Sequence, residues 1–494
     1  MTINQTVHQF IRFVIEQGSW SQLDRIYLTN RVIYLIGVEA IDPVEFIEEG
    51  TSPLELVDTL VQVAIENKKI QDNEYEVEAL RGQLMDLATP SPTEINETFN
   101  KLYQEKPEKA TEYFFEASKA NDYIKTREIG RNIEFPVATE FGDLEITINL
   151  SKPEKDPKDI ASSVKAVNVD YPKCMLCMEN EGYSGRPGYP NRFNHRVIRV
   201  PLGKEVWGFQ YSPYAYYNEH AIVFSETHQP MKIEKKTFNR LLKIIDWLPH
   251  YFVGSNADLP IVGGSILSHE HYQAGRFTFP IEKSELAWEF NLPQYSSVKA
   301  GVVKWPMSVI RISSDNQEEL IEAADYILTK WQAYSDESLN IVAKTSDGVK
   351  HHTITPIARK RDGQFEFDLV LRDNNISEEF PDGIFHPHPE LHHIKKENIG
   401  LIEVMGLAIL PPRLHREMKD VREFLLGKEN SIADYHLEWA QNIAKNHPIT
   451  SENVEKIVND EIGAVFLQVL KDAGVYKTNA EGEAGFKQFI ETLV

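Results

Sequence analysis

The sequence has few cysteines, no long apolar run and no excess of basic residues, and each of these gaps excludes a class of protein. Two cysteines among 494 residues cannot form a disulfide framework, and this predicts a reducing, cytoplasmic compartment. The longest apolar run, residues 32–38, falls well short of the ~20 residues that span a bilayer. The N-terminus lacks the basic region, apolar stretch and cleavage site of a secretion signal. We therefore expect neither export nor a membrane partner.

Basic residues are outnumbered, and the formal charge is −23. A surface of this sign repels nucleic acid and anionic membranes. A small phosphate-bearing ligand remains compatible with it, because a local group of arginine, histidine and backbone N–H can reverse the field. We therefore expect no nucleic-acid partner. The composition, 41% hydrophobic and 26% charged, is that of a globular protein, and the length suggests two or three domains.

Helical patterns fill the first 125 or so residues. Apolar residues from Ile3 to Val14 recur on one face of a helix, and Gly18 ends the pattern. The segments 52–55 and 91–94 both read Ser-Pro-x-Glu, a capping box with proline at the first helical position. We predict that this region is a scaffold without chemistry of its own.

Strand patterns begin after about residue 130. Residues 144–150 alternate strictly between apolar and polar, as a half-buried strand does. Residues 365–372 alternate in the same way except at Val370 and predict another strand. A helix is expected at 238–247, and helices again after about residue 415. The whole pattern predicts an α+β fold with a helical N-terminal region, two β-rich units and a helical C-terminal tail.

The segment 268–273, Ser-His-Glu-His-Tyr-Gln, carries the most informative chemistry. In a strand, alternate side chains share a face, so His269, His271 and Gln273 would point the same way. A histidine nucleophile needs a neutral ring oriented through its second nitrogen, and a donor that holds the phosphoryl oxygens. Gln273 could supply that donor. The alternative is an ordinary strand whose histidine rings are satisfied by hydrogen bonds.

Glycines precede this segment. Gly263 and Gly264, followed by Ser265, would allow the backbone to approach a phosphate closely. We therefore interpret Gly264 and Ser265 as candidate substrate contacts, and His271 and Gln273 as candidate catalytic residues.

The segment resembles the His-x-His-x-Gln motif of galactose-1-phosphate uridylyltransferases, members of the histidine-triad superfamily. Residues 254–263 resemble the bacterial second class of that family, and Glu270 stands where the better-known class has proline. The resemblance implies that UDP-glucose uridylylates His271 and releases glucose 1-phosphate. Galactose 1-phosphate would then take the UMP to form UDP-galactose in a ping-pong reaction, with Gln273 contacting the transferred phosphoryl group. Spacing alone does not choose His271 over His269.

The same resemblance implies the domain organisation. A helical region would occupy residues 1–125, and a first histidine-triad-like unit carrying the motif would occupy residues 126–300. A second such unit with the C-terminal helices would occupy residues 301–494. The relatives also imply a homodimer. We expect no organic cofactor.

The only cysteines, Cys174 and Cys177, form a Cys-x2-Cys knuckle. They could be half of a zinc site, a redox pair or two buried apolar residues, although no βαβ pattern nearby supports the redox reading. The family resemblance implies zinc, with His228 and His269 as the two further ligands. A zinc-bound His269 would hold the strand that carries His271.

A basic loop, residues 183–196, stands out in this acidic chain. Arg186, Arg192 and Arg196 could make bidentate contacts with phosphate oxygens, or the loop could be an ordinary solvated surface. Asn218 and Asn256 resemble family asparagines near the nucleotide, and we interpret both as candidate substrate contacts.

Four histidines lie within residues 386–393. Such density is typical of metal or phosphate contact. His386 and His388 resemble a pair that helps to hold iron in the better-known class, but matching partner ligands are not evident. A substrate-facing loop is an equal alternative.

Two other functions compete with uridylyl transfer. A histidine-triad nucleotide phosphorylase or hydrolase would pass the nucleotidyl group to inorganic phosphate or to water. A non-catalytic nucleotide-sugar-binding protein would bind UDP-glucose without releasing glucose 1-phosphate. The pairing of a nucleophile with an amide donor argues against simple binding, because a binding pocket needs neither.

Overall fold

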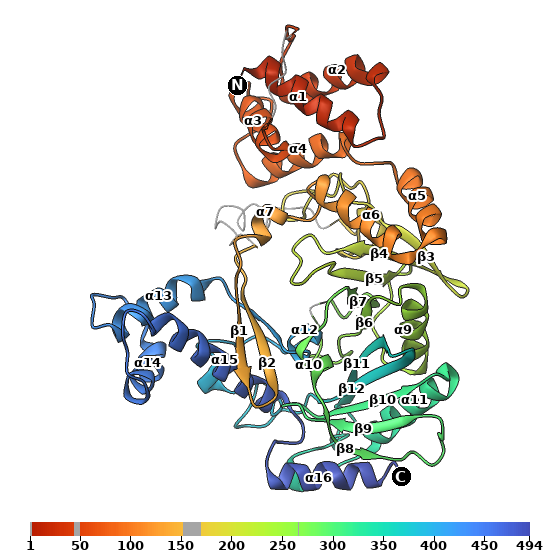
Figure 1. Ribbon diagram of the computed structural model, residues 1–494, viewed down its shortest axis with the longest axis vertical. Helices are drawn as coiled ribbons and strands as arrows, with labels where there is room; N and C mark the ends of the chain where they lie inside the picture. Colours follow the sequence, from red (N-terminus) through yellow and green to blue (C-terminus); the bar gives the residue numbers. More distant parts are fainter. Residues whose placement is uncertain (1, 44–49, 152–168, 265) are drawn as a thin grey trace. The chain divides into compact units, whose positions relative to one another are not determined.

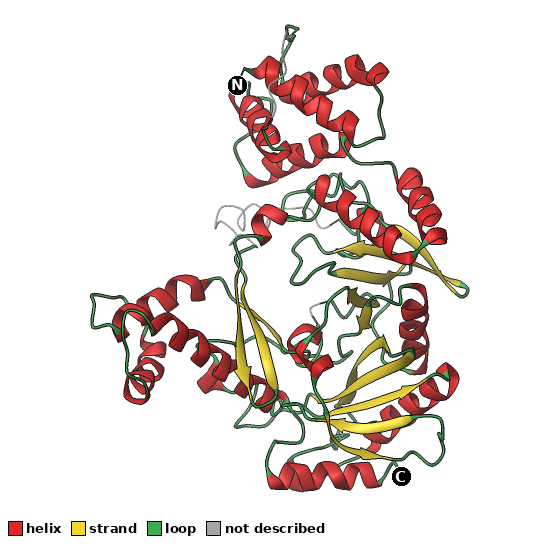
Figure 2. Cartoon of the chain, in the orientation of Figure 1, coloured by secondary structure: helices red, strands yellow, loops and turns green. Residues whose placement is uncertain are grey.

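The structure is a computed structural model that describes residues 2–43, 50–151, 169–264 and 266–494. Helices and strands are both abundant (Figure 1; Figure 2), so the predicted α+β class is confirmed. The chain divides into two compact units. The first comprises residues 1–126, 153–215 and 224–228, and the second comprises residues 127–152, 216–223 and 229–494. The predicted boundary near residue 300 stays a prediction.

The first unit begins with helices, as the sequence predicts. Ser52 caps α3 with a complete capping box, and the Ser91 side chain accepts from the Glu94 N–H at the start of α5. The apolar faces of the early helices form one buried core. The elements of this region are α1 (Ile3–Glu16), η1 (Gln22–Asp24), α2 (Arg25–Ile36), α3 (Pro53–Glu66), α4 (Glu74–Leu87), α5 (Pro92–Glu105) and α6 (Pro107–Ala120).

The rest of the first unit is a loop region and a hairpin. The loop contains η2 (Met178–Asn180), and the hairpin pairs β3 (Ile198–Leu202) with β4 (Glu205–Tyr211). Aromatic side chains of α5, α6 and β4 contact one another, with Phe114 and Phe209 5.7 Å apart between ring centroids. These contacts fasten the hairpin to the helices.

The second unit contains a large antiparallel sheet, in which consecutive neighbours run β7-β6-β11-β12-β10-β9-β8. Helices α9 (Lys235–Trp247) and α11 (Gln317–Ala333) lie against each other and against these strands. The strands are β6 (Phe252–Gly254), β7 (His271–Gly275), β8 (Leu286–Phe290), β9 (Lys299–Val303), β10 (Val309–Ser314), β11 (His352–Arg361) and β12 (Gln364–Asp373).

A smaller sheet lies in the same unit, with strand order β1-β2-β13, where β13 runs parallel to β2. It shares a hydrophobic core with the C-terminal helix α15. The remaining elements are α7 (Thr126–Ile129), β1 (Ile133–Thr139), β2 (Gly142–Ile148), β5 (Ala221–Ser225), α10 (Pro280–Lys283), η3 (Glu337–Leu339), η4 (Pro389–Leu391), α12 (Leu401–Val404), β13 (Leu407–Leu410), α13 (Arg413–Leu425), α14 (Asp434–Asn446), α15 (Val454–Ala473) and α16 (Ala480–Glu491).

Strand β12 differs from the half-buried strand that its alternation predicts, because its polar side chains are buried as well. Asp368 pairs with Arg311 and Arg359 from the neighbouring strands, and Arg359 also pairs with Glu366. A buried charge is tolerated when it is paired and hydrogen-bonded. Both faces of β12 are therefore buried. One face carries apolar side chains, and the other carries mostly charged ones.

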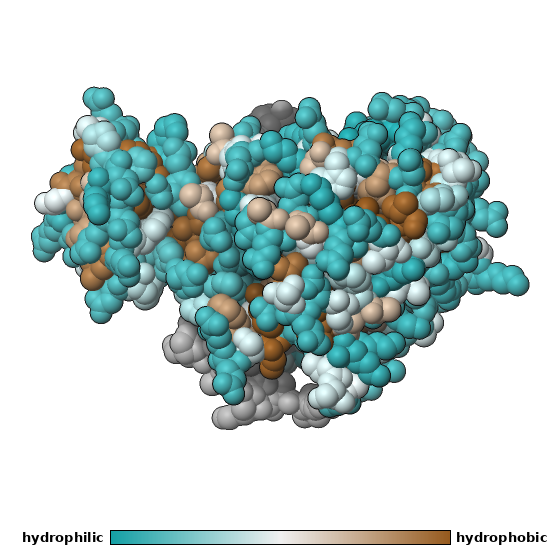
Figure 3. Space-filling view, turned by 90° about the horizontal axis from the view of Figure 1, so that it is seen from below, coloured by the Kyte–Doolittle hydropathy of each residue, from teal (hydrophilic) through white to brown (hydrophobic). Residues whose placement is uncertain are grey.

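Hydrophilic residues cover most of the face that Figure 3 shows, with hydrophobic residues in patches among them. None of the helices in the described part of the chain is long and apolar enough to cross a bilayer. This agrees with the absence of a long apolar run in the sequence.

Candidate active site

His271 is the first residue of β7, and its side chain is buried. Its Nδ1 lies 2.7 Å from the carbonyl oxygen of His269. A carbonyl can only accept, so Nδ1 carries the proton and Nε2 holds the lone pair. Burial lowers the pKa of His271 to about 4. The ring is therefore neutral at pH 7, and its Nε2 has the electron pair that a nucleophile needs.

Gln273, two residues further along β7, is held by a histidine that the sequence did not single out. His220 Nδ1 accepts from the backbone N–H of Tyr216, so its proton lies on Nε2. That nitrogen lies 3.1 Å from Gln273 Oε1 and donates to it. With its oxygen so occupied, the Gln273 amide keeps its NH2 for another acceptor.

His220 could not be found from sequence spacing, because it lies 53 residues before Gln273. It immediately precedes β5, and its ring stacks on Tyr217 with 4.3 Å between centroids. The only local signal is its place at the end of the aromatic segment 211–220, a pattern that is typical of core packing.

Glu270 lies between the two histidines of the motif and is also buried. Its carboxylate pairs with Arg240 of α9 and accepts hydrogen bonds from Tyr272 Oη and Gln229 Nε2. The backbone N–H of Glu270 donates to the Gln229 carbonyl. These contacts fix the backbone between His269 and His271.

The motif departs in one respect from a simple strand, because β7 begins at His271 and His269 precedes it. Strand alternation from 269 to 273 therefore holds only for His271 and Gln273. His269 is fully buried, and its carbonyl oxygen accepts from His271 Nδ1.

The glycine segment before the motif is closely packed against Asn256. A Cβ at Gly264 would lie 2.6 Å from Asn256 Nδ2, so no larger residue fits without a shift. The Asn256 side chain is buried, and its Oδ1 accepts from the Leu401 N–H. Ser265, the other candidate in this segment, lies outside the described residues.

The other asparagine candidate is exposed. Asn218 Nδ2 is 3.4 Å from the Arg276 carbonyl and 3.5 Å from Glu219 Oε1. Both asparagines stay predicted substrate contacts.

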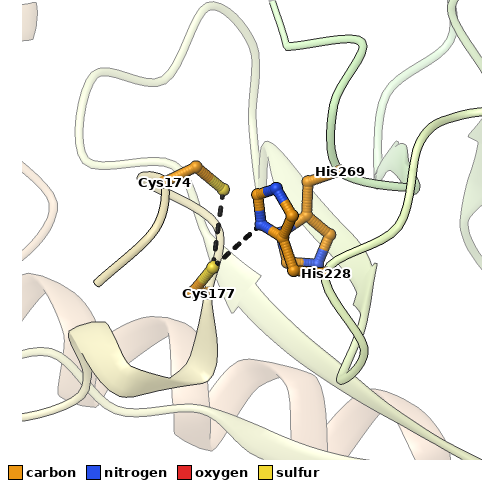
Figure 4. Close-up of side chains that lie close together, drawn as sticks. All are labelled: Cys174, Cys177, His228 and His269. Atoms are coloured by element: carbon orange, nitrogen blue, oxygen red, sulfur yellow. Dashed lines mark hydrogen bonds between the residues drawn. The ribbon is translucent and has the colours of Figure 1, made fainter. Parts of the chain in front are cut away.

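The cysteine knuckle lies beside a histidine in the first unit. Cys177 Sγ is 3.7 Å from Cys174 Sγ and 3.2 Å from His228 Nδ1. Together with His269 these side chains make a group whose potential ligand atoms all lie within 4.8 Å of one another (Figure 4). Two thiols and two imidazoles are a donor set typical of structural zinc. Burial raises the pKa of Cys177 to about 11, and the neighbouring Cys174 thiol adds to the effect.

The three loop arginines differ in their burial and in the contacts that their guanidinium groups make. Arg196 is buried, donates to the carbonyls of Pro90, Phe193 and His195, and pairs with Asp86. It thus anchors the loop to the helical region.

The other two arginines are less buried than Arg196. Arg186 donates to the carbonyls of Val169 and Tyr171 and lies over the Tyr189 ring. Arg192 Nη1 donates to the neighbouring Asn191 carbonyl, at 3.4 Å, and its guanidinium lies over the Tyr123 ring. The assignment of all three arginines to substrate stays a prediction.

In the histidine-rich segment near residue 390, His386 and His388 make different contacts. His386 Nε2 is 3.2 Å from Asn398 Oδ1 and its Nδ1 is 3.2 Å from the Pro387 carbonyl. His388 instead groups with Glu390 and Asp472, a different potential ligand set. A second metal therefore stays a prediction.

The chain matches two family models. Residues 18–230 match the model described as "Galactose-1-phosphate uridyl transferase, N-terminal domain". Residues 244–441 match the model described as "Galactose-1-phosphate uridyl transferase, C-terminal domain". Together the two models span most of the chain, including the cysteine knuckle in the first match and the histidine motif in the second.

Curated relatives are similar over nearly their full lengths. A galactose-1-phosphate uridylyltransferase of Enterococcus faecalis is 56% identical over 484 residues, covering 98% of this chain and 97% of the relative. Galactose-1-phosphate uridylyltransferase 1 of Streptococcus pneumoniae is 54% identical, covering 99% of each chain. A galactose-1-phosphate uridylyltransferase of Ligilactobacillus salivarius is 54% identical, covering 98% of this chain and 97% of the relative.

Proposed function

The chain belongs to the galactose-1-phosphate uridylyltransferase family, and from this premise we propose that it transfers a uridylyl group from UDP-glucose to galactose 1-phosphate. The products are UDP-galactose and glucose 1-phosphate. The observation that carries the proposal is the hydrogen bond from His271 Nδ1 to the His269 carbonyl, which leaves the lone pair on Nε2 of a buried, neutral ring.

In the first half-reaction, His271 Nε2 attacks the α-phosphorus of UDP-glucose. A bond forms between nitrogen and phosphorus, and the bond from that phosphorus to the bridging oxygen breaks. Glucose 1-phosphate leaves with the electron pair. The positive charge that develops on the imidazole is stabilised through Nδ1–H, which donates to the His269 carbonyl.

In the second half-reaction, a phosphate oxygen of galactose 1-phosphate attacks the same phosphorus. The phosphorus–nitrogen bond breaks, and His271 returns to its neutral form. The Gln273 NH2 donates to the phosphoryl oxygens in both steps, because His220 occupies the amide oxygen. Such a preorganised donor favours the transition state, in which negative charge accumulates on those oxygens.

We propose that Cys174, Cys177, His228 and His269 hold zinc. The two sulfur and two imidazole donors match the four ligands of a structural zinc site. Zinc would act as a structural cross-link that fixes His269, whose carbonyl orients His271. The chemistry of transfer rests on His271 and Gln273.

Intact-protein mass spectrometry tests the mechanism directly. Mixing the protein with UDP-glucose alone should add the mass of one uridylyl group, and peptide mapping should place it on His271. Addition of galactose 1-phosphate should then remove the adduct and yield UDP-galactose. His271→Ala should bind UDP-glucose yet form no adduct.

Other outcomes would identify the rival functions. An adduct that discharges to water or inorganic phosphate as fast as to galactose 1-phosphate would indicate a hydrolase or a phosphorylase. Binding of UDP-glucose with neither adduct nor released glucose 1-phosphate would indicate a non-catalytic nucleotide-sugar-binding protein.

A further inference from the structure

The turn that brings His220 to Gln273 contains a glutamate in a strained backbone conformation. Glu219, the residue before His220, has a φ of 54°, in the left-handed region that favours glycine and asparagine. Strain of this kind persists only where the surrounding structure holds the residue in place, and such residues cluster at functional sites. We therefore expect the side chain of Glu219 to make contacts that glycine could not supply.

The Glu219 carboxylate is buried and has partners on two neighbouring segments. Its Oε2 accepts from the hydroxyl of Tyr251, the residue before β6. Its Oε1 lies 3.9 Å from Nη1 of Arg276, the residue after β7. Strands β6 and β7 pair with each other, and Gln273 lies in that pairing (Figure 1). The two carboxylate oxygens therefore tie the turn to both strands.

The rest of the turn lies against the end of β7. The Tyr217 hydroxyl donates to the Ala274 carbonyl at 3.1 Å. A Cβ added at Gly275 would lie 2.8 Å from the Glu219 carbonyl oxygen and 2.7 Å from Tyr217 Cε2, so the turn approaches this strand as closely as glycine allows. Within the turn, the His220 N–H donates to the Tyr217 carbonyl. The turn as a whole thus sets the position of the His220 ring.

We propose that Glu219 is a positioning residue, whose buried carboxylate holds the strained turn and thereby keeps His220 Nε2 against Gln273 Oε1. This role rests on the proposed uridylyl transfer, in which the Gln273 NH2 donates to the phosphoryl oxygens. Glu219 acts through His220 and not by contact with substrate. Loss of the carboxylate should let the turn relax, so that His220 no longer fixes the orientation of the Gln273 amide.

Glu219→Gly tests this role, because glycine adopts the same φ without strain and removes only the side chain. Glu219→Asn serves the same purpose if the glycine variant does not fold, since asparagine tolerates this φ and is one carbon shorter. Glu219→Gln is the conservative variant, because its amide oxygen can still accept from the Tyr251 hydroxyl.

Asp362→Gly is the matched control. Asp362 also has a left-handed φ, of 49°, and it lies exposed in the turn between β11 and β12. The same type of substitution is thereby made at the same type of backbone conformation, away from His220. Circular dichroism checks that each variant folds.

The first readout is nitrogen NMR of the isotopically labelled imidazole rings, with the His220 signals assigned from their loss in His220→Phe. The unaltered protein should show His220 neutral, with its proton on Nε2. Glu219→Gly should shift these signals toward an average of the two tautomers, and Asp362→Gly should leave them unchanged. Because no substrate is needed, this measurement decides the positioning role even if the unaltered protein forms no uridylyl adduct.

The second readout is the rate of adduct formation in a single turnover. Glu219→Gly should slow it about tenfold, the effect of one hydrogen bond lost in the transition state, with little change in UDP-glucose affinity. Glu219→Gln should recover most of the rate. The double variant Glu219→Gly/His220→Phe should react at the rate of His220→Phe alone, because both changes break the same link.

Three results would overturn the proposal. The first is that Glu219→Gly leaves the His220 signals unaltered. The second is that Glu219→Gly forms the adduct at the unaltered rate. The third is that Glu219→Gly slows the reaction by the same factor in the His220→Phe background, which would show that the carboxylate does not act through His220.

Discussion

At the scale of single residues, the site depends on which nitrogen of each histidine carries the proton. A carbonyl acceptor fixes the proton of His271 on Nδ1, and a backbone donor fixes that of His220 on Nε2. Burial lowers the pKa of both rings to about 4, so both are neutral near pH 7. Two neutral histidines thus play opposite parts, one as the proposed nucleophile and the other as the donor that orients Gln273.

Replacing His220 should slow catalysis without abolishing it. His220→Phe keeps a ring beside Tyr217 and removes the donor to Gln273. The side-chain amide of Gln273 can then rotate and exchange the positions of its oxygen and NH2. We expect uridylyl-enzyme formation to slow about tenfold, the effect of one hydrogen bond lost in the transition state. Rapid-quench measurement of single turnovers should show this, with little change in UDP-glucose affinity.

The control for this change is His415→Phe, because His415 is exposed on α13. It should react at the rate of the unaltered protein. If His220→Phe also forms the adduct at the unaltered rate, the orientation of Gln273 does not depend on His220.

At the scale of elements, the segment that carries the motif is fastened to helix α9 by one buried ion pair. Glu270 and Arg240 are both almost fully buried, and Tyr272 and Gln229 complete the bonding of the carboxylate. The side-chain contacts of Glu270 thus hold the backbone at this position.

Breaking this ion pair should destabilise the fold. Glu270→Gln leaves the Arg240 charge buried without its partner, and we expect the free energy of unfolding to fall by about 3 kcal/mol. The exposed pair between Lys235, also on α9, and Glu322 provides the comparison. Glu322→Gln should have a much smaller effect, because water screens that pair.

Urea denaturation followed by tryptophan fluorescence measures both changes. The double variant Arg240→Met/Glu270→Gln should recover part of the loss, since it no longer buries an unpaired charge. Equal and small effects of Glu270→Gln and Glu322→Gln would show that the buried pair does not hold this segment.

At the scale of the whole molecule, the cysteine knuckle links parts of the chain that are far apart in sequence. Cys177 and His228 are 51 residues apart and lie 3.2 Å from each other between Sγ and Nδ1. A metal ion at this group would close long loops, which stabilises the folded state relative to the unfolded chain.

Metal analysis of the purified protein should find about one zinc ion per chain. Cys174→Ser and Cys177→Ser should each lower the zinc content and the midpoint of thermal unfolding, because zinc binds serine poorly. Met175→Leu, between the two cysteines and partly exposed, should change neither. Full zinc content in both cysteine variants would remove the cysteines from the ligand set.

Several features could be predicted from the sequence because the responsible interactions are local. The capped starts of α3 and α5 follow from serine, proline and glutamate within four residues; the structure has the complete predicted capping box at α3 and, at α5, the hydrogen bond from the Glu94 N–H to the Ser91 side chain. The His-x-His-x-Gln motif is equally short, and together with residues 254–263 it was sufficient to predict the family, which the comparisons confirm. Residue spacing within one segment carries this information directly.

Only the tertiary structure decided which distant residues complete the site. The contacts of His220 with Gln273, of Arg240 with Glu270 and of Arg196 with Asp86 join residues that are 53, 30 and 110 positions apart. Likewise, His388 lies beside Asp472, which is 84 positions further along the chain. Hydrogen-bond partners of this kind depend on how strands and helices pack, and no local pattern encodes them. The sequence thus determined the fold class and the family, and only the packing of strands and helices decided the hydrogen-bond and ion-pair partners of each candidate site residue.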